Sequence, residues 1–162
     1  MAATGLEVFD RTLQTTHIWL DEIMERQGPD RQHAWRCLGA VLHALRDRVP
    51  VELAAHLGAQ LPLLVRGLYY DQWKPEHQPV RARHLDDFLA RVAEGLHGAR
   101  PTDPREATEA VFHVLTHHLD PGQVGKLVHA LPEPVREAWM RVAAVSLPGS
   151  TGPAAGPAGG PG

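Results

Sequence analysis

Apolar residues recur every three or four positions along most of the chain, the spacing that gathers them on one face of an α-helix. The first run stops at Gly28, and its helical positions are Phe9, Leu13, Thr16, Leu20 and Ile23. A second run begins after Asp30, a residue suited to an N-cap, and ends at Pro50. A third run starts there, and Pro62 breaks or kinks it before Tyr70. This half of the chain is therefore predicted to hold helix, helix and kinked helix.

The same order of signals returns after residues 71–79, a stretch with two prolines and no helical period that is typical of a loop. Helical spacing resumes over residues 85–96. Asp-Pro pairs at 103–104 and 120–121 then open two further helices, because aspartate caps a helix and proline fits its first turn. A last helix begins at Pro132. The second half is therefore predicted to repeat the helical order of the first.

A shift of 70 residues aligns positions 40–69 with 110–139 without a gap. Nine of the thirty aligned pairs are identical, where composition alone predicts about two or three. Repeated units with an apolar face are expected to bury it against one another. We therefore predict an all-α helical bundle of two pseudo-two-fold related repeats, each of three to four helices. The identical pairs are Ala40/Ala110, Val41/Val111, His43/His113, Leu45/Leu115, Leu57/Leu127, Leu61/Leu131, Pro62/Pro132, Val65/Val135 and Arg66/Arg136.

The repeats are expected to share one domain over residues 1–147, with repeat one at about 6–73 and repeat two at about 82–142. Residues 148–162 contain four prolines and six glycines. Such a segment has almost nothing to bury against the entropy of ordering it, so we expect a disordered tail.

The repeated segments also carry a family resemblance. The stretch AVLHALRDRVPVELAAHLGAQLPLLVRGLYYDQW resembles the first repeat of the bacterial family called domain of unknown function 2267, and AVFHVLTHHLDPGQVGKLVHALPEPVREAW resembles its degenerate second repeat. AQLP followed by RGLYY and a tryptophan is the most specific part. The resemblance covers about residues 5–142 and implies an all-helical, duplicated fold with no assigned reaction. Glu133 and Pro134 replace Leu63 and Leu64 in the second copy, so any shared surface role is expected mainly in the first.

Charge and composition narrow the classes of function. A formal net charge of −3 lacks the basic excess that binds a phosphate backbone, so we expect no nucleic-acid partner, although VPVELAAHLGAQLP has the look of a helix-turn-helix. No apolar run approaches the roughly 18 residues of a membrane span, and the first residues do not resemble a secretory signal. Cys37, the single cysteine, is expected to be a buried, inert thiol. A cytoplasmic protein fits these features.

The candidate chemical residues are histidines. His113 and His117 stand four residues apart on a predicted helix, the spacing that places two imidazoles on one face, but no HExxH or CxxC pattern supplies further zinc ligands. His43 and His113 occupy equivalent positions in the repeats and would respond to pH if they met. Two independent histidines are the simpler interpretation. No catalytic motif occurs, so we expect neither an enzyme nor a cofactor.

A cluster of aromatic and basic residues lies where the first repeat passes into the loop. Tyr70 and Trp73 follow Arg66, and neither aromatic is required by the repeat, whereas Tyr69 matches Trp139 and is expected in the core. The leading hypothesis is a non-enzymatic module that binds a protein partner or a second copy of itself through this cluster, a homodimer being one form. Trp73 folded back onto the bundle is the plain alternative. A ligand-, metal- or pH-sensing domain that uses histidines between the repeats is the second hypothesis.

Overall fold

The computed structural model describes residues 4–81 and 83–146, and within these ranges it contains eight α-helices, one 3₁₀ turn and no strand. The predicted all-α fold class is therefore confirmed. The predicted tail, residues 148–162, lies outside the described residues. The elements are α1 Glu7–Gln27, α2 Arg31–Arg48, α3 Val51–Gln60, α4 Leu63–Tyr70, η1 Pro75–His77, α5 Leu85–Gly95, α6 Pro104–His118, α7 Pro121–Ala130 and α8 Glu133–Ser146.

Aspartate side chains begin three of the helices, as the sequence predicts. Asp30 accepts from the backbone N–H groups of Gln32 and His33, and Asp103 and Asp120 cap α6 and α7 in the same way. Pro62 does not kink a continuous helix: α3 ends before it and α4 begins after it. Each cap satisfies backbone donors that a helix start leaves without partners.

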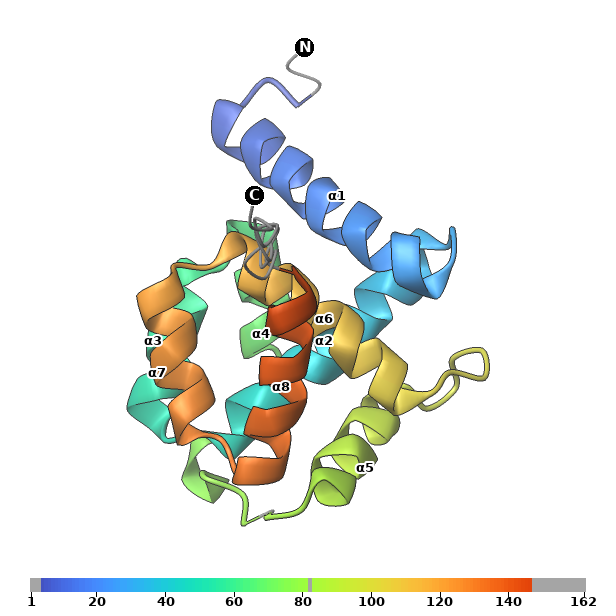
Figure 1. Ribbon diagram of the computed structural model, residues 1–162. Coiled ribbons are helices and arrows are strands. Elements are labelled where there is room, and N and C mark those ends of the chain that lie inside the picture. The colour runs from blue at the N-terminus through green and yellow to red at the C-terminus, as the bar shows by residue number, and fades with distance from the viewer. Residues whose placement is uncertain (1–3, 82, 147–162) are drawn as a thin grey trace, which may run out of the picture.

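Helices α2 and α6 lie at the centre of the molecule, in contact with each other and with most other helices (Figure 1). Most of their apolar side chains are buried, and Phe112 on α6 stacks on Trp139 of α8 with ring centroids 4.3 Å apart. Tyr69 is fully buried, as predicted, and its hydroxyl donates to the Ala54 carbonyl at 2.6 Å. Cys37 is also buried, and burial raises the pKa of its thiol to about 11. One hydrophobic core therefore joins the two halves of the chain.

The helix boundaries from the end of α2 to the start of α4 correspond to those from the end of α6 to the start of α8 at the shift of 70 residues. Helices α3 and α7 have the same length at this spacing, and α4 and α8 begin at equivalent positions. Arg66 and Arg136 make equivalent hydrogen bonds as well, donating to the Leu61 and Leu131 carbonyls at 3.0 and 3.2 Å. The local structure that follows each proline is thus formed twice.

The contacts between helices also correspond between the first and second halves of the chain. Helix α1 packs on α2 and α6, while α5 packs on α6 and α2; α3 also meets α7. Each such contact has a counterpart when α1–α4 are exchanged with α5–α8. Helix α5 crosses α2 closely, because a Cβ on Gly95 would lie 2.7 Å from the Cβ of Ala40. This crossing forms one wall of a groove of about 740 Å³.

Candidate functional site

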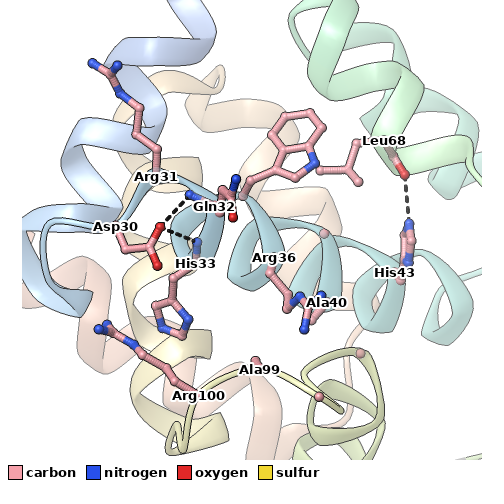
Figure 2. Close-up of a pocket in the computed structure, with 14 residues that line it drawn as sticks. Asp30, Arg31, Gln32, His33, Arg36, Ala40, His43, Leu68, Ala99 and Arg100 are labelled. Carbon is pink, nitrogen blue, oxygen red and sulfur yellow. Dashed lines mark hydrogen bonds between the residues drawn. The ribbon is translucent and has the colours of Figure 1, made fainter.

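A groove of about 740 Å³ runs along the solvent side of α2, bounded by the end of α4, the end of α5 and the loop that follows α5 (Figure 2). Its volume lies within the usual range for small-molecule pockets. The lining comprises Asp30, Arg31, Gln32, His33, Trp35, Arg36, Gly39, Ala40, His43, Leu68, Gly95, Gly98, Ala99 and Arg100. We refer to it as the basic groove.

The floor of the basic groove comes from one face of α2. Arg36, Gly39 and His43 follow one another at spacings of three and four residues, so their Cα atoms share that face. Small residues let neighbouring elements approach, since a Cβ on Gly39 would meet Leu68 Cδ1 at 3.1 Å. Larger side chains at these positions would close the groove.

Positive charge dominates the basic groove. The Arg36 guanidinium donates to the His97 carbonyl at 3.4 Å, and that of Arg100 donates to the Gln27 carbonyl. In the part of the chain that the structure describes, no carboxylate forms an ion pair with either guanidinium. Asp30 is the one acidic residue of the lining, and its Oδ1 is committed to the cap of α2. Arg31 lies at the rim, 4.0 Å from Asp21.

Both histidines of the basic groove favour the neutral form. His43 Nε2 donates to the Leu68 carbonyl at 2.7 Å, which leaves Nδ1 as an acceptor. Burial is the main cause that lowers the pKa of His43, and Arg46 and Arg91 lower it further. Burial also lowers the pKa of His33, with Arg100 as the next cause. An anion placed here would therefore meet two guanidinium groups. It would also favour the protonated, positively charged form of the two imidazoles.

The three residues of the predicted partner-binding cluster all make contacts within the chain. Arg66 donates to the Gly58, Ala59 and Leu61 carbonyls and so caps the end of α3. Tyr70 rests against Gly58, and its hydroxyl lies 3.4 Å from the Ala55 carbonyl.

Trp73 stands beside Tyr70, with ring centroids 5.4 Å apart, and its indole N–H donates to Gln78 Oε1 at 2.6 Å. Its ring also lines a second cavity, of about 560 Å³, together with Lys74 and His77. The two aromatics are therefore adjacent and partly buried, with their polar tips engaged inside the chain.

The predicted histidines fall in two different environments. His43 lies in the basic groove, with Arg46, Asp47 and Arg91 as its charged neighbours. His113 instead has Glu22, Glu25 and Arg26 of α1 nearby, together with His117. The charged neighbours of the two histidines therefore have no residue in common.

Sequence reasoning missed the arginines of the groove. Arg36 and His43 share a helical face with Gly39 between them, a pattern readable from the sequence. Arg100 comes from a loop more than 60 residues away, and no local pattern places it beside α2. The groove becomes visible only when the tertiary contacts are known.

Comparison with known proteins identifies a family but no assigned activity. A family model described as an uncharacterized conserved protein (DUF2267) matches residues 16–138. Comparison with curated proteins finds no match. Among the residues that the structure describes, no helix is long and apolar enough to cross a bilayer.

Proposed function

The chain belongs to the DUF2267 family of uncharacterized conserved proteins, and we propose that it is a non-enzymatic helical domain that binds a small anionic molecule in the basic groove. The observation that carries this proposal is the pair Arg36 and Arg100, two guanidinium groups that face one groove without a carboxylate partner among the described residues. Guanidinium groups bind carboxylate and phosphate oxygens through paired hydrogen bonds.

The proposal fits a chain whose overall charge is negative. A formal net charge of −3 gives no general attraction for anions, so the basic groove would act as a local exception. Trp35 and Leu68 add apolar surface to the lining, which suits a ligand with both an anionic and an apolar part. The lining contains no serine, cysteine or threonine, and this supports binding rather than nucleophilic catalysis.

Titration calorimetry at low salt with inorganic phosphate, pyrophosphate and citrate tests the proposal. We expect at least one of the three to bind, and replacing Arg36 and Arg100 together by glutamine to weaken binding by about tenfold or more. The matched control replaces Arg11 and Arg105, two exposed arginines paired with Glu7 and Glu109, and removes the same charge elsewhere. Equal weakening in the control, or no binding by the unmodified chain, would contradict the proposal.

We further infer that the two halves are related by a near-two-fold rotation within one core. The corresponding helix boundaries and the exchange-symmetric contacts support this arrangement. An experimental structure tests it: residues 40–69 should superpose on 110–139 by a rotation close to 180° about an axis between α2 and α6. A simple translation between the halves would exclude it.

Self-association is the second candidate function, and one feature favours it. The apolar stripe of α1 fills the core at Leu20 and Ile23, yet it continues into the first turns, where Phe9 and Leu13 are 48% and 38% exposed. The start of α1 projects from the bundle (Figure 1), and Thr12 accepts a hydrogen bond from the Leu64 N–H of α4 at 3.0 Å. A second copy of the chain is the occupant we propose, because a two-fold dimer interface uses one such patch twice.

Sedimentation equilibrium measures this directly. The unmodified chain should sediment as a dimer, and replacing Phe9 and Leu13 together by serine should return it to the mass of one chain. Replacing Met140, which is 56% exposed on α8, is the control and should leave the dimer intact. A monomeric unmodified chain at all concentrations would exclude this candidate.

A further inference from the structure

Three side chains able to bind a metal meet where α1 passes the end of α6. Glu22 Oε1 lies 2.9 Å from His117 Nδ1 and 2.8 Å from His118 Nε2. The three potential ligand atoms all lie within 4.8 Å of one another. Two imidazoles and one carboxylate form a donor set that Zn²⁺ uses in proteins. None of these residues lines the basic groove, so this cluster is independent of the function proposed above.

The distances are close to those that a shared ion would impose. Ligand atoms that bind one Zn²⁺ at about 2.1 Å stand roughly 3.0–3.4 Å apart, depending on coordination geometry. The carboxylate oxygen would have to move by only a few tenths of an ångström from its present distances to both nitrogens. The two imidazole nitrogens lie within 4.8 Å of each other, so a shared ion would draw them closer together by at most about 1.8 Å.

Neighbouring residues orient the ligands. Consecutive side chains on an α-helix point about 100° apart, so His117 and His118 reach one point only by using different ring nitrogens. The His118 ring stacks on the buried Trp19 ring, with centroids 5.3 Å apart and an interplanar angle of 20°. Packing thus holds one imidazole in its orientation, as supporting groups do around metal ligands.

The Glu22 carboxylate provides a second observation, besides the ligand distances, that favours a bound metal ion. Glu22 Oε2 is buried and, within the described residues, has no hydrogen-bond partner, while Oε1 lies against both imidazoles. Buried carboxylate oxygens normally have partners, because desolvation of an unpaired one is costly. His117 is 60% exposed, so an ion can reach the cluster from solvent.

We propose that Glu22, His117 and His118 form a site for one divalent transition-metal ion, with Zn²⁺ as the ion to test. Water or His113, one helical turn earlier on α6 and close to Glu22 and His117, completes the coordination. Such a site would join α1 to α6 through a bond that neither helix can make alone.

Titration calorimetry of the full chain, purified without a histidine tag, tests the site with ZnCl₂. We expect one Zn²⁺ per chain, and at least about tenfold weaker binding after Glu22→Gln or His118→Gln, because each removes a ligand. His129→Gln is the control, since His129 is an exposed histidine on α7, and it should bind as the unmodified chain does. If Glu22→Gln and His118→Gln both bind Zn²⁺ as strongly as the unmodified chain does, the proposal is overturned.

A second measurement needs no variant of the ligands. Co²⁺ quenches tryptophan fluorescence at short range, and Trp19 touches His118. CoCl₂ should therefore cause a saturable loss of fluorescence that ZnCl₂ competes away, and Trp19→Phe should abolish most of this loss while Zn²⁺ still binds. Absence of saturable quenching in the unmodified chain would overturn the proposal even if the ligand variants failed to fold.

Discussion

Helices α2 and α6 share some buried residues but differ in the charge of the residues on their solvent-facing sides. At the shift of 70 residues some buried positions hold the same residue, as with Val41 and Val111, whereas others differ, as with Leu42 and Phe112; all four are fully buried. On the outer side, Arg36 of α2 stands where α6 has Glu106. Gly39, which opens the groove, stands where α6 has Glu109. The two helices therefore share part of their buried residues, while α2 is basic and α6 acidic at the outer position of Arg36 and Glu106.

The helices that cross α2 and α6, which are α5 and α1, also carry charges of opposite sign at these contacts. Arg91 of α5 pairs with Asp47 of α2 at 3.1 Å. The residue equivalent to Asp47 is His117, and Glu22 of α1 lies 2.9 Å from it. In the first contact the crossing helix supplies the basic residue, Arg91. In the second contact the crossing helix supplies the acidic residue, Glu22. The anion site that we propose therefore lies on the outer face of α2, and the proposed metal site lies at the end of α6.

The largest effect should come from the core that the halves share. Leu57 and Leu127 occupy equivalent positions on α3 and α7 and are 4% and 2% exposed. Replacing either by alanine should lower the free energy of unfolding by about 2–5 kcal/mol, because the cavity left behind is only partly refilled. Urea denaturation measures the loss. Leu63→Ala, at a position that is 50% exposed, should change it by about 0.5 kcal/mol or less. A small effect at only one of the two leucines would show that the halves do not share the core equally.

A smaller effect should come from a pair of residues that the halves fill differently. A Cβ on Gly58 would lie 2.3 Å from the Tyr70 hydroxyl, and the second half has Val128 and Met140 at these positions. Gly58→Ala should therefore cost about 1–3 kcal/mol by overpacking, despite the better helix propensity of alanine.

The double variant Gly58→Ala with Tyr70→Met removes the phenol ring that the added methyl group would meet, and should recover most of that loss. Thermal unfolding of the single and double variants measures the coupling. If Gly58→Ala alone is stabilising, Tyr70 moves freely, and the cluster that contains Trp73 is less tightly held than its contacts indicate.

Most of the fold could be predicted from the sequence because its signals are local. The spacing of Leu38, Leu42 and Leu45 places them on one helix face, and all three are fully buried. Asp103 and Asp120 begin helices because a carboxylate satisfies the N–H groups just after it. Exposure of Phe9 was not predictable, since the α1 stripe has the same period where it meets the core and where it extends past it.

The candidate sites could be predicted only in part because their residues come from distant segments. His117 was identified by its spacing from His113, but the carboxylate beside it comes from α1, 95 residues away. Arg66 and Tyr70 were predicted at a binding surface, yet their polar groups are engaged by the carbonyls of α3. A sequence shows which side chains are available, whereas packing decides which of them meet.

The smallest effect is on the pH dependence of stability. It separates the buried and partly buried histidines of α2 and α6 from exposed histidines. Burial lowers the pKa of His43, and also those of His33 and His113, below the value of 6.5 expected in the unfolded chain. Between the folded pKa and 6.5, the unfolded chain therefore binds more protons than the folded chain. Stability is thus fully present above about pH 6.5 and decreases as the pH falls through this window. Urea denaturation between pH 7.5 and 5.5 should show this decrease, and His43→Gln, which can still donate to the Leu68 carbonyl, should make it shallower. His129→Gln, at an exposed position on α7, should leave the slope unchanged. A slope that His43→Gln does not alter would mean that the hydrogen bond to the Leu68 carbonyl, together with Asp47, offsets the effect of burial and of the two arginines on the pKa of His43.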